Sequence, residues 1–265
     1  MNVIILAAGY ATRLYPLTRD VPKPLLEIGG QTILDRLVNQ IERALPGAEI
    51  RIVTNRRFAA RFHDWARQRR GTPLRILDDG TTDPENRLGA IGDLAFALRH
   101  SDGANDVLVS AADNLFEFDF AEFVAAFQRA PGVWIGVHRV EDPERRRRTG
   151  IAELDATGRV IGFQEKPSAP RSPWGVPPLY VLDAQAARLV GEYLASGGSR
   201  DALGHFLEWL YPRVPVHAWP IRGAVHDIGT LESLSACRAR YAANGRAILA
   251  PETGGQTHRK NSGGE

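Results

Sequence analysis

The feature that most constrains the fold is an alternation of short, unbroken apolar runs with segments whose apolar residues recur at helical spacing. Residues 3–7 form the first such run, and residues 33–44 form the first segment with the helical period. An unbroken apolar run is typical of a parallel strand that is buried on both faces. Strands that alternate with helices build a mostly parallel sheet covered by helices, so the pattern predicts an α/β fold.

The same reasoning along the chain predicts the order of the elements. Strands are expected at residues 3–7, 50–54, 74–77, 106–111, 133–139, 150–154, 160–165, 179–182 and 216–220. Helices are expected at residues 33–44, 58–68, 93–99, 184–194, 202–211 and 228–243. The strands of the second half are short and are separated by turn signals, which predicts a distinct, smaller β region there.

One domain accounts for the periodic part of the chain. Residues 1–250 have the length of one generous α/β domain. Residues 251–265 are polar and glycine-rich without periodicity, which predicts a disordered tail. Cys237 is the sole cysteine, so no intramolecular disulfide can form, and a reducing, cytoplasmic location is the default expectation.

Charge and hydropathy argue against two classes of partner. The formal net charge of +2 is too small to indicate a nucleic-acid or membrane surface. The one dense charge block, residues 144–148, is interpreted as a solvated loop. No stretch approaches the roughly 18 apolar residues of a membrane span, and no basic segment precedes the first apolar run. We expect neither a nucleic-acid nor a membrane partner, while a homo-oligomer stays open.

The loop after the first predicted strand has the composition of a phosphate-binding site. Ala8, Gly9 and Ala11 follow the strand, and small residues let backbone N–H groups approach an anionic ligand closely. Arg13 and Lys23 bring positive charge to the same strand end. Ligands of open α/β sheets bind at the carboxyl ends of the strands, so the sequence predicts an anion site at this edge.

Four blocks in order resemble the signature of the sugar-phosphate nucleotidyltransferases, the group that holds glucose-1-phosphate thymidylyltransferases and mannose-1-phosphate guanylyltransferases. The blocks are residues 6–18 with 22–26, residues 112–114, residues 163–167 and residues 225–232. The resemblance covers roughly residues 1–240. It implies a Rossmann-like three-layer α/β/α sandwich with a mainly parallel central sheet and a small acceptor-binding β subregion.

One departure from the signature concerns the backbone of the first loop. The second glycine of the family's first block is Ala11 here. If that position needs a positive φ, the alanine costs about 1 kcal/mol.

The resemblance also implies a reaction, the Mg²⁺-dependent transfer of a nucleoside monophosphate from an NTP to a phosphorylated small molecule. A sugar 1-phosphate is the expected acceptor. Asp113 and Asp227 would bind the metal, since Mg²⁺ takes hard oxygen ligands and usually only one or two carboxylates. Arg13 would neutralise charge on the transferring and leaving phosphates. Lys23 would assist at the triphosphate, and Lys166 would grip the acceptor's phosphate.

The remaining site residues follow from the same blocks. The nucleotide-binding residues that the resemblance implies are Leu6, Ala8, Gly9, Glu85, Gly89 and Ala112. The acceptor-binding residues that it implies are Asn114, Gly150, Glu165, Lys166 and Tyr180. Residues 174–180 depart from the family's acceptor stretch, and Trp174 either stacks against a ring or packs a core strand.

The sequence indicates the nucleobase preference less clearly than the rest of the site. Residues 85–94 resemble the L-G-T-A-G-x-L block of guanylyl- and cytidylyl-transferring relatives, which favours GTP or CTP. Guanine and cytosine carry an exocyclic amine, and Asp93, Glu85 or a backbone carbonyl could accept its hydrogen bond. Alternatively, Glu85 and Asp93 cap the following helix.

Four rival functions compete with this prediction. An RNA-binding protein that uses the arginine run is disfavoured, because the net charge is near neutral and no aromatic RNA-binding motif is present. Thymidylyl or uridylyl transfer would use the same mechanism with another base, and a non-catalytic regulatory relative would bind nucleotide only. A dinucleotide-dependent oxidoreductase is disfavoured, because the sequence has no G-x-G-x-x-G followed by a ribose-binding acid. The sequence leaves the acceptor, the base and the oligomeric state open.

Overall fold

The computed structural model describes residues 1–101 and 105–249 of the chain. The predicted tail, residues 251–265, lies outside the described residues. The central sheet contains β1 (Asn2–Leu6), β4 (Ile50–Thr54), β5 (Leu74–Asp78), β6 (Val107–Ala111), β8 (Val133–Arg139), β9 (Gly150–Leu154), β10 (Val160–Glu165), β11 (Trp174–Val176), β12 (Leu179–Leu182) and β13 (Val216–Pro220). The helices are α1 (Ile33–Ala44), α2 (Ala59–Gln68), α3 (Ala90–Arg99), α4 (Phe120–Arg129), α5 (Pro143–Arg146), α6 (Ala184–Ala195), α7 (Leu203–Leu210) and α8 (Leu231–Leu249).

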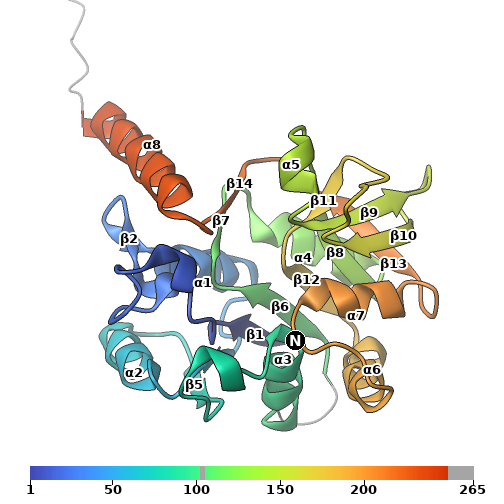
Figure 1. Ribbon diagram of the computed structural model, residues 1–265, viewed down its shortest axis with the longest axis horizontal. Helices are drawn as coiled ribbons and strands as arrows, with labels where there is room; N and C mark the ends of the chain where they lie inside the picture. Colours follow the sequence, from blue (N-terminus) through green and yellow to red (C-terminus); the bar gives the residue numbers. More distant parts are fainter. Residues whose placement is uncertain (102–104, 250–265) are drawn as a thin grey trace, which may run out of the picture.

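Helices cover both faces of the sheet (Figure 1). The alternation along β1 shows why two layers form, because Val3 and Ile5 pack with α1, α2 and α4. Ile4 and Leu6 point the other way and pack with α3, α6 and α7. A strand that is apolar on both sides must be covered on both sides. The three-layer α/β/α sandwich is therefore confirmed.

The sheet has a parallel half and a mixed half. Strands β5, β4, β1 and β6 are neighbours in that order and run parallel. Strand β12 pairs antiparallel with both β6 and β8, and β13 runs parallel to β8. Strands β9, β10 and β11 extend the sheet in antiparallel fashion at the far edge, where the smaller β region was expected.

Two helix starts differ from the sequence prediction by three residues, and two helices, α4 and α5, were not predicted. Helix α5 forms where a solvated loop was expected. Helix α3 begins three residues before the predicted position, because Gly89 adopts φ 78° and starts the helix there. Helix α8 begins three residues later, because Thr230 and Ser233 cap its start through reciprocal bonds of 3.1 and 3.2 Å. Helix α4 was not predicted, and it is capped by Asp119, whose side chain accepts from the N–H of Ala121 at 2.9 Å.

A short ribbon beside the sheet was also not predicted. Strands β7 (Asn114–Phe116) and β14 (Val225–Asp227) pair antiparallel, with Asp227 opposite Asn114. A second small hairpin joins β2 (Glu27–Ile28) to β3 (Gln31–Thr32). Helix α8 follows β14 and extends away from the rest of the fold (Figure 1). Among the described residues, none of the helices combines the length and apolar character that a membrane crossing needs.

Candidate functional site

The loop after β1 lies at the carboxyl ends of the parallel strands. The N–H of Ala112, directly after β6, donates to the carbonyl of Leu6 at 2.9 Å. The side-chain amide of Asn55, directly after β4, donates to the carbonyl of Ala8 at 2.9 Å. Leu6, Ala8 and Ala112 are buried, whereas Gly9 is exposed and a Cβ there would meet no atom within 4 Å. The backbone at Gly9 is thus open to a ligand.

Ala11 occupies the left-handed region, as the glycine of the family signature would. Its φ is 48° and its ψ is 43°. The hydroxyl of Thr18 donates to the carbonyl of Ala11 at 2.8 Å, and the N–H of Leu14 donates to the same carbonyl at 2.9 Å. These two bonds hold the strained turn in place, so the condition for a cost of about 1 kcal/mol is met.

Lys23 and Asp113 form a close ion pair at this edge. Lys23 is buried and stands in the 3-10 turn η2 (Lys23–Leu25), between two prolines. Its Nζ lies 3.1 Å from Oδ2 of Asp113, whose side chain is 41% exposed. Asp113 connects β6 to β7. The proline-flanked turn therefore holds Lys23 against the carboxylate of Asp113, which remains accessible to solvent and ligands.

Asp227 and Arg13 join the same group. A Cβ on Gly229 would lie 3.2 Å from Oδ2 of Asp227 and 3.6 Å from Nη2 of Arg13, so both side chains border this glycine. Burial and the negative charge of Asp113 raise the pKa of Asp227, while Lys23, Arg13 and Arg145 oppose that rise. The structure thus brings together the four charged residues that were predicted for the phosphate and metal chemistry.

Arg145 is the site neighbour that sequence reasoning missed. It belongs to the arginine run that was interpreted as a solvated loop. It is exposed, yet its charge acts on Asp227 and on His138 of β8. The neighbouring Arg146 donates from Nε to the carbonyl of Val140 at 2.5 Å, which fastens α5 to the end of β8. No spacing in the sequence indicates this placement, because it depends on how α5 folds back.

The carboxylate pair has the character of a magnesium site. Mg²⁺ usually binds to one or two carboxylates and completes its octahedron with phosphate and water oxygens. Asp113 and Asp227 offer two such groups close to fixed positive charge. The described residues contain no group of three or more His, Cys, Asp and Glu side chains that could hold a metal ion. A transition-metal cage of that kind is therefore not found in the described part, whereas the donors that Mg²⁺ needs are present.

Glu165 and Lys166 lie at the end of β10, in the smaller β region. Oε1 of Glu165 is 3.4 Å from Nζ of Lys166, and the Glu165 side chain is 8% exposed while that of Lys166 is 54% exposed. Lys166 has a φ of 48°, which is strained for a residue with a Cβ. A Cβ on Gly150 would lie 3.1 Å from Oε2 of Glu165, so this glycine makes room for the carboxylate.

Helix α7 supports Glu165 from the other side. The N–H of Glu165 donates to Oε1 of Glu208 at 2.6 Å, and Oε2 of Glu208 lies 3.3 Å from Nδ1 of His205. Burial raises the pKa of Glu165, and the charges of Lys166 and His205 oppose it. Tyr180 is buried, and burial together with the charge of Glu165 raises its pKa well above the usual value.

Two other predicted acceptor features lie apart from each other. Asn114 is buried in β7, where its side-chain amide donates to Oδ1 of Asp113 at 2.7 Å. Asn114 therefore lies beside Asp113, one of the two predicted metal ligands, rather than beside Glu165. Trp174 pairs in β11 and packs against the main hydrophobic core, in agreement with the core-packing alternative.

The predicted nucleobase residues are not brought together. Glu85 is exposed in the 3-10 turn η3 (Pro84–Asn86), and the side chain that caps this turn belongs to Asp83. Gly89 packs tightly, since a Cβ there would lie 2.3 Å from the carbonyl oxygen of Arg200. Asp93 is buried inside α3 and contacts Asp79. The interpretation of Glu85 and Asp93 as helix caps is wrong, because Gly89 begins α3 without a side-chain cap.

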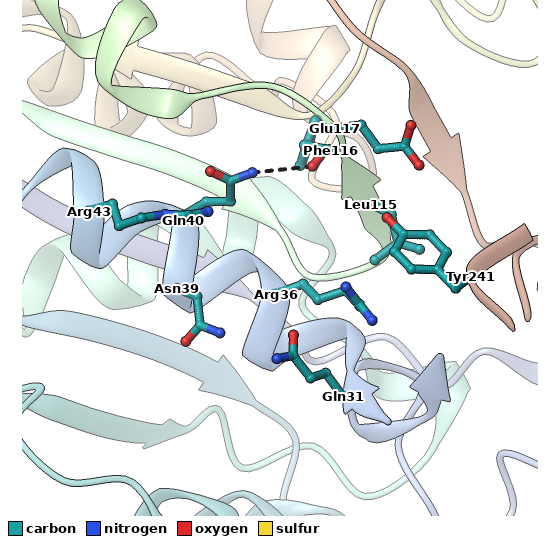
Figure 2. A pocket seen from close by; sticks show the side chains of 9 residues that line it. All are labelled: Gln31, Arg36, Asn39, Gln40, Arg43, Leu115, Phe116, Glu117 and Tyr241. Atoms are coloured by element: carbon teal, nitrogen blue, oxygen red, sulfur yellow. Dashed lines mark hydrogen bonds between the residues drawn. The ribbon is translucent and has the colours of Figure 1, made fainter. Parts of the chain in front are cut away.

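A separate polar cavity of about 350 Å³ lies between α1, β7 and α8 (Figure 2). The guanidinium of Arg36 stacks on the ring of Tyr241 at 4.2 Å, and Gln40 donates to the carbonyl of Phe116 at 3.4 Å. Glu117 pairs with Arg240 at 2.8 Å. None of the predicted site residues lines this cavity.

The family model described as nucleotidyl transferase matches residues 2–244. The chain belongs to the nucleotidyl transferase family. The resemblance that the four blocks carry is thereby confirmed.

Two curated relatives match part of their own length. The chain is 26% identical over 230 residues to the bifunctional protein GlmU of Methanocaldococcus jannaschii, which covers 86% of this chain and 51% of the relative. It is 27% identical over 172 residues to GlmU of Methanococcus aeolicus, with 65% and 38% covered. The chain thus spans about half the length, or less, of these curated relatives.

Two solved structures share the fold. One is a Bacillus anthracis protein assigned as a glucose-1-phosphate thymidylyltransferase, in complex with sucrose; the TM-score is 0.77 at 24% identity, covering 91% of this chain and 95% of that one. The other is a UDP-glucose pyrophosphorylase complexed with UDP-glucose; the TM-score is 0.77 at 18% identity, covering 92% and 98%. At these identities the likeness shows the fold alone.

Proposed function

We propose that the chain transfers a nucleoside monophosphate from an NTP to a phosphorylated small molecule, with a sugar 1-phosphate as the expected acceptor. A phosphate oxygen of the acceptor attacks the α-phosphorus of the NTP, and the bond to the β-phosphate oxygen breaks, which releases pyrophosphate. The observation that carries the proposal is the convergence of Arg13, Lys23, Asp113 and Asp227 beside the open backbone of Gly9.

These four residues can promote nucleotidyl transfer without a covalent intermediate between the nucleotide and the protein. Positioning and electrostatic stabilisation carry most of the rate in such transfers. Asp113 and Asp227 would hold Mg²⁺, which would neutralise negative charge on the phosphates of the substrates. Arg13 would stabilise the leaving pyrophosphate through its fork of N–H donors. Lys23 orients Asp113 through their 3.1 Å contact and adds positive charge at the triphosphate.

The acceptor would lie across the smaller β region. The half-exposed ammonium of Lys166 is placed to bind the acceptor's phosphate. Glu165 is buried beside Gly150, and its carboxylate would accept hydrogen bonds from sugar hydroxyls. A buried carboxylate that is left unpaired by the wrong acceptor carries a desolvation cost, so this contact supports discrimination between acceptors.

For the base, we propose a preference for GTP or CTP over dTTP and UTP. The support is the block at residues 85–94, whose backbone turns at Gly89 with φ 78°. Because Asp93 is engaged with Asp79, the acceptors left for an exocyclic amine are Glu85 and the carbonyls of this loop.

The test is to incubate the protein with Mg²⁺, each of GTP, CTP, dTTP and UTP, and a panel of sugar 1-phosphates, and to measure pyrophosphate. Release that requires both substrates and Mg²⁺ is the expected result. Preferred use of dTTP or UTP would overturn the base assignment alone. Nucleotide binding without pyrophosphate release from any pair would favour the non-catalytic regulatory alternative.

A further inference from the structure

Asp79 and Asp93 place two carboxyl groups in direct contact beside the nucleobase block. Asp79 follows β5, and Asp93 lies in the first turn of α3 with 6% of its surface exposed. Oδ2 of Asp79 and Oδ1 of Asp93 are buried and accept no bond from a described N–H or O–H donor. Each carboxyl group lies within hydrogen-bonding reach of the other. Two carboxylates can only accept, so one of the pair must carry a proton to donate.

The other oxygen of Asp79 ties the pair to the loop after β1. Oδ1 of Asp79 accepts from the N–H and the hydroxyl of Thr81 at 2.7 and 2.8 Å. The hydroxyl of Tyr10 then donates to Oγ1 of Thr81 at 3.2 Å. Tyr10 directly follows the open backbone at Gly9. The acid pair, residues 79–81 and the first loop are therefore one connected hydrogen-bonded unit.

The surroundings favour the protonated form. Helix α3 packs against β1, β4, α6 and α7, and among their described residues and those of the adjoining loops Asp79 is the charged group that acts on Asp93. Burial, and then the charge of Asp79, raise the pKa of Asp93 to about 8. The titratable and charged groups near Asp79 and Thr81 are Tyr10, Asp78, Asp83, Arg56 and Arg57. Arg56 is engaged with Asp78 at 3.0 Å, so it does not neutralise the pair.

We propose that Asp93 is a positioning residue that holds residues 79–81 against Tyr10 and the loop after β1 by donating a shared proton to Asp79, and that this loop needs that support to bind nucleotide. Loss of that proton puts two negative charges in contact within a buried space. The pair then separates and pulls Thr81 away from Tyr10. The shared proton is independent of the catalytic assignment, whereas its effect on nucleotide affinity rests on the proposed function.

The first experiment measures stability against pH by urea unfolding of the wild type, Asp93→Asn and Asp64→Asn. In the unfolded chain Asp93 ionises near its usual pKa, whereas the folded chain keeps the proton up to about pH 8. Unfolding therefore releases a proton in this window, and stability falls as pH rises through it. The unfolding constant of the wild type should rise about tenfold per pH unit relative to Asp93→Asn between pH 6 and 8, and should level off above.

Asp93→Asn and its control Asp64→Asn separate the effect of the titrating proton from the effect of changing a side chain. Asp93→Asn keeps the size and donates from its amide to Asp79 at every pH, so it carries no titrating proton at this position. Asp64→Asn makes the same chemical change at an exposed position of another helix, and it should follow the wild-type profile. A constant difference between wild type and Asp93→Asn from pH 6 to 9 would show that no proton is shared and would overturn the proposal.

The second experiment measures the KM for GTP and CTP at pH 7 and pH 9 in the same three proteins. Because the pKa of Asp93 is about 8, about one molecule in eleven keeps the Asp93 proton at pH 9. If only the protonated form binds nucleotide, the KM should rise up to about tenfold between pH 7 and pH 9. Asp93→Asn should show no such rise, and kcat should change little. A KM ratio that is equal in wild type and Asp93→Asn would overturn the positioning role.

Failure of the proposed function is distinguishable from failure of this inference. If no NTP is turned over with any acceptor, the nucleotidyl transfer assignment fails. The unfolding profile then still decides whether Asp79 and Asp93 share a proton, because it needs no substrate.

Discussion

Substitution of Gly204 by alanine tests how α7 shapes the acceptor side of the site. Gly204 is the second residue of α7 and faces β10. A Cβ at this position would lie 1.8 Å from Oε2 and 2.7 Å from Cδ of Glu165, and 3.2 Å from Cε1 of Phe163. Such contacts cannot exist, so Gly204→Ala must push the carboxylate of Glu165 out of its place.

The expected magnitude follows from two opposing terms. Alanine is favoured over glycine in a helix interior by at most about 1 kcal/mol. Overpacking a buried contact costs about 1–3 kcal/mol, so the net loss of stability should lie between zero and about 2 kcal/mol. The larger effect falls on the acceptor, because a hydrogen bond to a charged group contributes about 1.5–3 kcal/mol. Loss of that bond should lower kcat/KM for the acceptor by roughly 10- to 100-fold.

The matched control is Gly191→Ala in the neighbouring helix α6, where a new Cβ meets no atom within 4 Å. This variant should gain about 1 kcal/mol from helix propensity, raise the Tm by about 2–4 °C, and leave the acceptor KM unchanged. Thermal melting and saturation curves for the acceptor provide both readouts. If Gly204→Ala is stabilised like Gly191→Ala and keeps its acceptor kcat/KM, the assigned role of Glu165 is refuted.

Three further predictions concern the other parts of the site. Asp113→Asn or Asp227→Asn should lower kcat at saturating Mg²⁺ by at least about 100-fold, the loss expected for one key electrostatic contact; normal kcat in either variant would remove that residue from the mechanism. Lys166→Ala should chiefly raise the KM for the acceptor, whereas Arg13→Ala should chiefly lower the single-turnover rate; the reverse pattern would mean that the two phosphates are misplaced. Ala11→Gly should raise the Tm by about 2–4 °C, because it removes about 1 kcal/mol of left-handed strain; an unchanged or lower Tm would show that the strain is offset elsewhere.

The fold was predictable where burial alone decides the secondary structure. Strand β4 and helix α1 begin and end at the predicted residues, since an unbroken apolar run and a helical period leave little choice. Helix α4 was missed because Phe116, Phe118 and Phe120 recur at every second residue, which is the period of a strand. Only the cap at Asp119 breaks that pattern and turns the following phenylalanines onto a helix.

The site was predictable where a functional residue directly follows an element end. Asp113 follows β6, and the ends of parallel strands meet at one edge, so its meeting with Lys23 could be expected from the family blocks. Arg145 and the Asp79–Asp93 contact could not be predicted in this way. Both depend on which distant segments fold against each other, and neither residue spacing nor composition reports such a contact.

The two acid pairs at this sheet edge show how surroundings assign different tasks to the same residue type. Lys23, Arg13 and Arg145 all act on Asp227 and favour its charged form, and Asp113 remains partly exposed. A pair with that positive surrounding can present two negative oxygens to a divalent cation. Asp79 and Asp93 have no cation in contact within the described part, and their facing oxygens are buried. Such a pair lowers its energy by keeping a proton, so one pair suits metal binding and the other suits holding the loop in place.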